Sequence, residues 1–193
     1  LLPVDSGEVS LPTHNVSIGN PYQALQNRVA YVPKDRDGEA LMMGASIQNN
    51  FCLPSVETLK GRFGFLSPKK LYQASSKARE QFSVKSTGVD QLMRALSGGN
   101  KQKVNLGRWL IKDLDVLIVD CPTRGVDIGV KAYIYQCLRE AKEKGMAILL
   151  ITDELSEVLG MADTIAVMKD GEICKLLPRS AELSEETIIE VMT

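Results

Sequence analysis

A glycine-paired turn, a helix and an acid-terminated strand follow one another in the middle of the chain. The turn consists of Ser97, Gly98, Gly99 and Asn100. The spacing of the apolar residues that follow predicts a helix over 101–112. Ser97 can cap that helix, and the two glycines allow an anion to approach the backbone N–H groups at its positive end. The chemistry that these residues could support is therefore phosphate binding.

The segment after this helix carries the candidate acid. An apolar run at 116–119 predicts a buried strand, and Asp120 closes it. An aspartate at the carboxyl end of a buried, β-branched strand is where α/β sheets place metal and ligand chemistry. Taken singly, Ser-Gly-Gly is usually a plain loop and a strand-end aspartate is common. The Ser-Gly-Gly turn and the strand-end aspartate together are a far more specific signal than either of them alone.

Strands that alternate with helices must position these residues. Strands are predicted at 28–32, 116–119, 146–151 and 164–168, and helices at 46–50, 69–82, 130–144, 154–161 and 184–192. Gly145 is expected to end the helix at 130–144, and Asp-Gly at 170–171 predicts a hairpin turn. This order indicates an α/β domain with a largely parallel sheet and a helical insert.

Composition and charge narrow the function classes. The chain has 193 residues, which suits one domain, and its net charge of −1 with dispersed basic residues argues against a nucleic-acid surface. Its longest apolar runs are too short to span a bilayer, and no signal peptide opens it. The four cysteines form no CxxC pair, so Cys52, Cys137 and Cys174 are expected to be small core residues in a reducing cytoplasm. His14, the only histidine, is expected on the surface.

Three sequence motifs together resemble the nucleotide-binding domain of ABC transporters. They are LSGGN at 96–100, VLIVD at 116–120 and TRGVD at 123–127, which match the signature loop, the Walker B strand and the D-loop. Asn100 and the TRGVD form of the D-loop are similar to the carbohydrate-importer branch, in particular to the second of two fused ATPase domains of ribose- or galactose-type importers.

The resemblance implies a fold and a division of the chain. The fold would be a P-loop NTPase-like, mostly parallel sheet with an α-helical subdomain insert. Residues 1–193 would be a single, N-terminally truncated nucleotide-binding domain. Within it, 1–39 and 97–193 would form the α/β core and 40–96 the helical subdomain.

The resemblance also assigns roles to single residues. The signature loop 97–100 would bind ATP in trans, Asp127 would contact the opposing subunit, and Asp120 would hold Mg²⁺ through water. Three further positions depart from the family. Lys34 stands at the Q-loop position and cannot coordinate a cation, and Cys121 replaces the glutamate that acts as general base. Asp153 replaces the switch histidine and would repel a phosphate. All three catalytic positions are thus expected to be degenerate.

No GxxxxGK[ST] phosphate loop occurs in the sequence. By resemblance, the chain is expected to begin just downstream of that motif, and the strand that precedes the motif would lie between the strands at 146–151 and 164–168. A gap there would leave buried backbone groups unpaired. We therefore expect an upstream segment to fill it. The alternatives are a strand donated by a partner and a sheet that has closed up with altered order.

Two functions from different classes remain open. The first is the degenerate ATP-binding domain of a carbohydrate importer, peripheral on the cytoplasmic face of the membrane. It would share a composite site for ATP and Mg²⁺ with a second ATPase domain and contact membrane permease subunits through its helical subdomain, without binding the sugar or nucleic acid. The alternative is a non-hydrolysing regulatory or interaction module. A soluble ABC protein of DNA repair or translation lacks support, because the sequence has neither coiled-coil heptads nor a basic stripe. The chain alone is predicted to be inactive as an ATPase.

Overall fold

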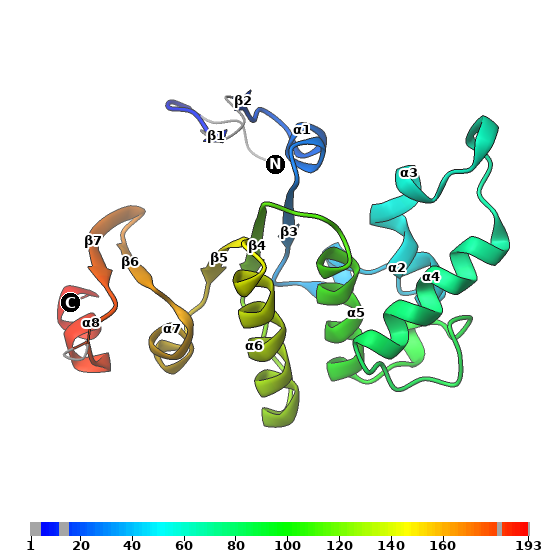
Figure 1. Ribbon diagram of the computed structural model, residues 1–193. Coiled ribbons are helices and arrows are strands. Elements are labelled where there is room, and N and C mark those ends of the chain that lie inside the picture. Colours follow the sequence, from blue (N-terminus) through cyan, green and yellow to red (C-terminus); the bar gives the residue numbers. More distant parts are fainter. Residues whose placement is uncertain (1–4, 12–15, 181–182, 193) are drawn as a thin grey trace.

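A three-stranded parallel sheet lies at the centre of the computed structural model, which describes residues 5–11, 16–180 and 183–192 (Figure 1). Its strands are β3 (Val29–Val32), β4 (Val116–Asp120) and β5 (Ala147–Ile151), in the order β3-β4-β5. Val116 is paired with Val29 on one side and with Ala147 on the other. The predicted α/β fold with a parallel sheet is confirmed.

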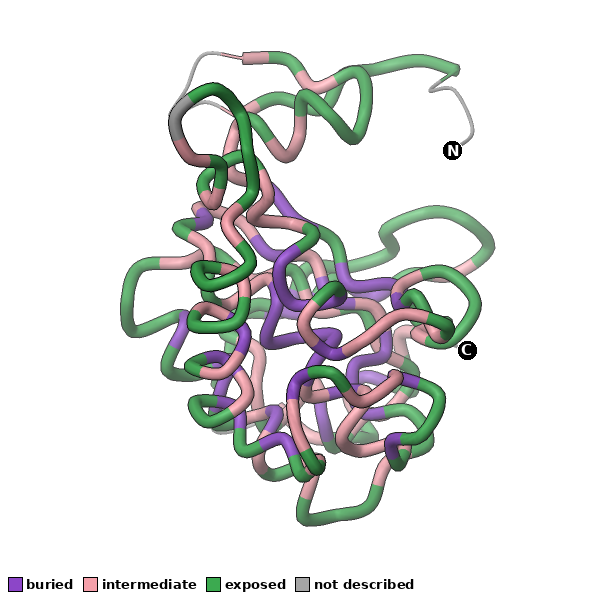
Figure 2. The backbone as a smooth tube through the Cα atoms, turned by 90° about the vertical axis from the view of Figure 1, so that its right-hand side faces the viewer, coloured by how far each residue is buried: buried purple, intermediate pink, exposed green. Residues whose placement is uncertain are grey.

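One face of this sheet is packed against helices. Successive strand residues point to opposite faces, and Val32, Leu117 and Val119 on the packed face are fully buried. They share a core with residues of α5 (Gly98–Leu110) and α6 (Ile128–Glu143). Gly145, with φ of 95°, follows α6, as its sequence position predicts. Figure 2 shows the buried residues gathered in the middle of the molecule.

The opposite face of the sheet is largely uncovered by the described residues. Tyr31, Ile118 and Leu149 form a row across the three strands. Tyr31 is 45% exposed, Leu149 54% and Ile151, two residues further along β5, 46%. A row of large apolar side chains that face outward is unusual for a finished sheet, because parallel sheets are normally covered on both faces.

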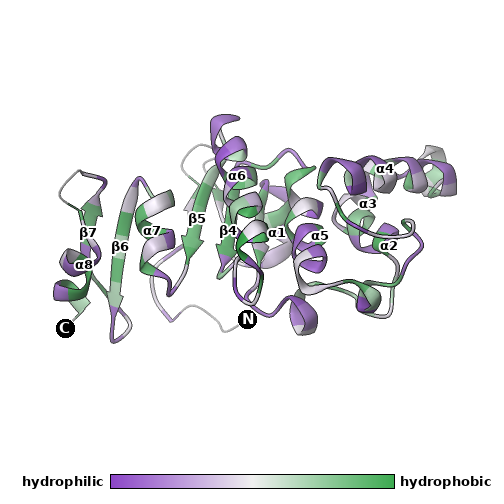
Figure 3. Ribbon diagram, turned by 90° about the horizontal axis from the view of Figure 1, so that it is seen from below, coloured by the Kyte–Doolittle hydropathy of each residue, from purple (hydrophilic) through white to green (hydrophobic). Residues whose placement is uncertain are grey.

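A separate antiparallel hairpin completes the carboxyl-terminal part. It consists of β6 (Thr164–Lys169) and β7 (Glu172–Pro178), joined through Asp170 and Gly171, both with positive φ. The hairpin packs with α7 (Leu155–Met161) and α8 (Glu185–Met192) around its own small core. β6 does not pair with β5, and α7 lies between them (Figure 3). Among the described strands, the sheet has therefore not closed up.

The segment between β3 and α5 consists of helices, connecting loops and isolated β-bridges. Its elements are the π-helical turn η1 (Arg36–Ala40), α2 (Ile47–Cys52), η2 (Leu53–Ser55), α3 (Val56–Leu59), η3 (Arg62–Gly64), α4 (Pro68–Gln81) and η4 (Met93–Ala95). Ile47, Phe51 and Met93 are fully buried and belong to the same core as the sheet.

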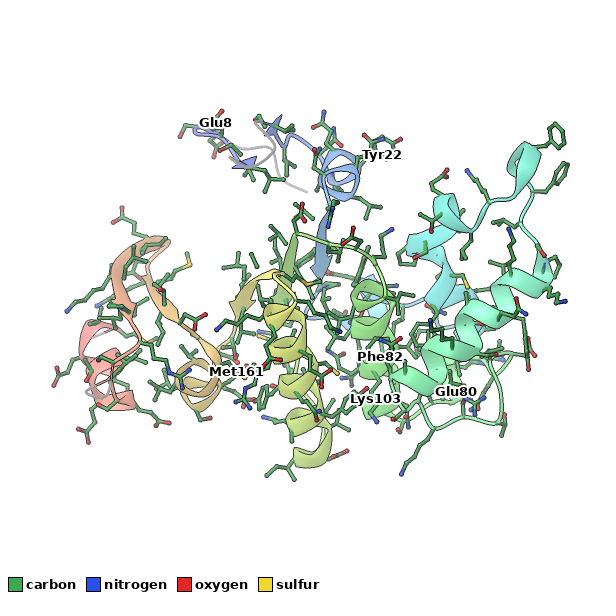
Figure 4. The ribbon with its side chains drawn as sticks, viewed as in Figure 1. Glu8, Tyr22, Glu80, Phe82, Lys103 and Met161 are labelled. Atoms are coloured by element: carbon green, nitrogen blue, oxygen red, sulfur yellow. The ribbon has the colours of Figure 1, made fainter. Side chains whose placement is uncertain are left out.

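Gly107 of α5 allows a close approach to the end of this helical segment. A Cβ at Gly107 would lie 2.6 Å from the ring of Phe82, just beyond α4. The Lys103 ammonium donates to the backbone oxygen of Ser83 at 3.1 Å, so α5 and the end of α4 are joined there (Figure 4).

The amino-terminal elements are short. β1 (Ser10–Leu11) pairs with β2 (Val16–Ser17), and α1 (Pro21–Gln26) follows with Asn20 as its N-cap. His14 lies outside the described residues. The prediction that Cys174 is a core residue is wrong, because it is exposed on β7, whereas Cys52 and Cys137 are buried as predicted. Within the described part of the chain, none of the helices has the length and apolar character needed to cross a membrane.

Candidate functional site

The carboxyl ends of the three parallel strands bring three of the predicted site residues together. Lys34 follows β3, Cys121 follows β4 and Asp153 follows β5. The Lys34 ammonium lies 3.8 Å from a carboxylate oxygen of Asp153. The hydroxyl of Tyr31 donates to a carboxylate oxygen of Asp120 at 3.2 Å. Residues from three distant parts of the sequence thus share one edge of the sheet.

Cys121 is held in an unusual backbone conformation. Its φ is +44°, in the left-handed region that few side chains adopt, and its N–H donates to the Ile151 oxygen at 2.8 Å. Burial raises the pKa of the Cys121 thiol, the hydrogen bond with Asp120 and the nearby Asp153 raise it further, and the Lys34 charge opposes them. A thiol whose pKa is raised is protonated at neutral pH, so this environment does not favour a thiolate at Cys121.

The residues of this edge do not fit a magnesium ion on their own. Mg²⁺ prefers several oxygen ligands in octahedral geometry. Asp120 offers one carboxylate, and its neighbours are the Tyr31 hydroxyl and the Cys121 thiol, of which the thiol is a poor ligand for a hard cation. Among the described residues, no cluster of three or more His, Cys, Asp or Glu could hold a metal ion.

The signature loop is part of helix α5 rather than a turn before it. α5 begins at Gly98, three residues earlier than predicted. Ser97 occupies the N-cap position, but the prediction that its side chain caps the helix is wrong, because its Oγ makes no capping bond. Instead, the Asn100 Nδ2 donates to Ser97 Oγ at 2.9 Å, and the Lys85 N–H donates to Asn100 Oδ1 at 2.8 Å. The Asn100 side chain therefore ties Ser97 to the segment before η4.

The D-loop lies against the start of α5. Asp127 is the N-cap of α6, where its Oδ1 accepts the Val130 N–H at 3.0 Å. A Cβ on Gly99 would lie 2.7 Å from a methyl group of Val130, so only glycine permits this approach. The first turns of α5 and α6, whose N–H groups have no intrahelical partner, thus face the same region.

Sequence reasoning assigned no role to Arg36, which the structure places between these two loops. Its Nη1 donates to the backbone oxygen of Arg124 at 3.2 Å. The available signal was the run Lys-Asp-Arg-Asp at 34–37 directly after a strand that ends at Pro33. A charge run in a loop is normally solvated, and nothing in its spacing pointed to α5.

Solved structures with the same fold define the class of this domain. A nucleotide-free ATP-binding cassette from an ABC transporter matches with a TM-score of 0.77 at 22% identity, over 98% of this chain and 78% of that one. A dimeric cassette in a post-hydrolysis state, bound to ADP and phosphate, matches with a TM-score of 0.75 at 18% identity, over 92% and 75% of the two chains. The fold is that of an ATP-binding cassette, a P-loop NTPase-like α/β domain.

The sequence comparisons identify the family. The family model described as ABC transporter matches residues 1–124. The chain belongs to the ABC transporter family, as an ATP-binding domain. A ribose import ATP-binding protein of Lactococcus lactis is 38% identical over 188 residues, which are 97% of this chain and 38% of that protein. One of Corynebacterium glutamicum is 36% identical, over 96% of this chain and 35% of that protein. The chain thus spans a little over a third of the length of these relatives.

Proposed function

We propose that this chain is the degenerate second ATPase domain of an ABC-type carbohydrate importer. Lys34 and Asp153 carry the proposal. At the positions where family members face the γ-phosphate, these two side chains have opposite charges and lie against each other. Both are substantially exposed, so their attraction contributes only about 0–1 kcal/mol. This ion pair matters more for the chemistry of the site than for stability, because the charges of Lys34 and Asp153 face each other rather than a nucleotide.

Hydrolysis by this domain's own edge is not expected. A general base must accept a proton from the attacking water, and the protonated thiol of Cys121 cannot do so. The Asp153 carboxylate would repel the phosphate that a switch histidine contacts in the family. Asp120 remains as the candidate to hold Mg²⁺ through water, with the metal's other ligands coming from outside the described residues.

The signature loop is the part of the site that we propose remains active. Gly98 and Gly99 lie in the first turn of a 13-residue helix, where unpaired N–H groups and the helix dipole favour an anion. ATP held by a second ATPase domain would meet these groups and Ser97 in trans, beside Asn100. Asp127 would contact that domain from the D-loop.

The partners follow from the same proposal. The relatives are named for ribose import, which favours a transport role over a regulatory module. We propose that the helical segment 40–96 is a subdomain that contacts membrane permease subunits, and that the protein is peripheral on the cytoplasmic face. The sugar would bind elsewhere, and no nucleic acid is involved.

The uncovered sheet face supports the idea that further chain belongs to this domain. Leu149 and Ile151 on β5 are half exposed, and β5 and β6 do not pair. A strand inserted between β5 and β6, from an upstream segment that also carries the phosphate loop, would satisfy the β5 edge. The helix that this loop opens in the family would cover these side chains. A strand donated by a partner is the alternative occupant.

ATP turnover by the proposed two-domain protein tests the function. Ser97→Arg places a bulky cation on an exposed residue of the signature loop and is expected to abolish hydrolysis at the other domain's site. Cys121→Ser is the matched change at the degenerate edge and is expected to leave turnover within about twofold. Normal turnover in Ser97→Arg would refute the role in trans, and a large loss in Cys121→Ser would refute the degeneracy.

A further inference from the structure

A short charged segment directly after Lys34 is folded back on itself. The Asp35 carboxylate accepts the N–H groups of Asp37 and Gly38 at 3.2 and 2.9 Å. The Leu41 N–H donates to the Arg36 oxygen at 2.9 Å, which closes the π-helical turn η1. These bonds give the segment a defined shape, although it is largely exposed.

Two cations of α5 hold this turn at its two ends. The Lys101 ammonium lies 2.9 Å from a carboxylate oxygen of Asp37, and the Arg108 guanidinium donates to the Ala40 oxygen at 2.6 Å. Lys101 and Arg108 are seven residues apart, which places them two turns apart on one side of the helix. Arg108 is buried, and burial lowers its pKa to about 10, so it remains charged at neutral pH.

Arg36 lies on the other side of the turn, between the signature loop and the D-loop. Its Nη1 donates to the Arg124 oxygen at 3.2 Å. Its Nη2 is 3.1 Å from the position that a Cβ on Gly98 would occupy, and 3.9 Å from that position on Gly125. The backbones of both loops therefore approach one guanidinium group, and the absence of a side chain at Gly98 makes room for it.

We propose that Arg36 is a positioning residue that sets the spacing between the signature loop and the D-loop. Lys101 and Arg108 fix the Arg36–Ala40 turn to α5, and the Arg36 guanidinium connects that assembly to the loop that leads into α6. The planar guanidinium group of an arginine suits this role because it carries several N–H donors in a fixed geometry, whereas a lysine would offer a single ammonium group. The consequence for ATP bound in trans rests on the proposed function, but the contact itself does not.

Amide hydrogen exchange in the full chain tests the contact without a nucleotide. The reporters are the N–H of Lys101, bonded to Ser97, and the N–H of Arg124, bonded to Cys121. Arg36→Gln keeps a polar side chain but removes the positive charge and the planar set of guanidinium N–H donors. It is expected to speed exchange at these amides about tenfold, the factor that a hydrogen bond to a charged group typically represents. Amides of α4, which Arg36 does not touch, are expected to be unchanged, whereas a general loss of stability would raise exchange there too.

A double-mutant cycle isolates Arg36 from other neighbours. Gly98→Ala adds a methyl group against the Arg36 guanidinium and is expected to raise exchange at Arg124. In the Arg36→Gln background that added effect should fall by at least about threefold, because interacting residues are not additive. Gly99→Ala is the matched control, since its methyl group meets Val130 instead. Its effect should be the same with and without Arg36.

The outcomes are distinguishable. The proposal is overturned if amide exchange is unchanged in Arg36→Gln. It is also overturned if replacing Arg36 changes the effects of Gly98→Ala and Gly99→Ala on exchange equally. Faster exchange with Gly98-specific coupling supports it. ATP turnover of Arg36→Gln in the two-domain protein is then measured, and a fall in kcat is expected. If exchange changes as expected and kcat does not, the positioning contact stands and the proposed function in trans is refuted.

Discussion

Leu149 offers a direct test of whether another segment covers the exposed face of the sheet. In this chain Leu149 is 54% exposed, whereas Leu117 on the packed face of the neighbouring strand is fully buried. Complete burial of a leucine side chain contributes about 1.5–3 kcal/mol. A side chain that is a little less than half buried therefore contributes about 1 kcal/mol to stability. Leu117→Ala, which leaves a cavity in the core, is expected to cost about 2–5 kcal/mol.

The assay is urea unfolding of both variants in this chain and in the proposed two-domain protein. The fluorescence of Trp109, the only tryptophan, and circular dichroism report the transition. In this chain Leu149→Ala should cost about 1 kcal/mol. In the longer protein, where the inserted segment would bury Leu149, its cost should rise to about 2–5 kcal/mol. Leu117→Ala should cost the same in both, as the control. If Leu149→Ala stays near 1 kcal/mol in the longer protein, the added segment does not cover this face.

Three further outcomes are expected. The chain alone should release phosphate from ATP no faster than background, because we propose that Lys34, Cys121 and Asp153 occupy catalytic positions and loss of a general base alone costs about two to four orders of magnitude. A purified preparation that turns over above about 0.1 per second contradicts this. In the two-domain protein, Cys121→Glu should restore little activity of this domain's own site, and a large gain would show that the other two departures are harmless. At pH 8, iodoacetamide should modify the exposed Cys174 well before Cys121 or Cys52. Burial shields these two thiols and raises their pKa, so that their thiolate fraction grows only at higher pH. Peptide mass spectrometry that finds Cys121 modified first would refute this.

The fold could largely be predicted because its strands and helices have strong periodic patterns. The strands around Val119 and Leu150 and the amphipathic α6 appear close to their predicted bounds, although β5 is not buried as predicted. The start of α5 could not be predicted in the same way. Gly98 and Gly99 have poor helix propensity and indicate a turn. Close approach to Val130 requires glycine at Gly99, and Gly98 leaves room for the Arg36 guanidinium. These tertiary contacts are invisible in a local sequence pattern.

Part of the candidate site could be predicted from single residues of the sequence. Lys34, Cys121 and Asp153 follow three parallel strands, so their convergence could be expected from the strand pattern. Arg36 could not be found, because its contacts outside its own turn are to a backbone oxygen and two glycines far away in the sequence. Cys174 was misassigned because β7 belongs to a two-stranded hairpin, most of which remains exposed.

The shared core of the sheet and the helical segment has a consequence for protein engineering. Ile47, Phe51 and Met93 pack in the same cluster as Val32 and Leu117. A chimera that exchanges residues 40–96 with those of a relative, in order to change the proposed contact with membrane permease subunits, would also exchange part of the core against which the sheet packs. Such a graft should fold only if the inward-facing residues of the recipient are retained, with the surface of α2 to α4 as the part that can be exchanged freely.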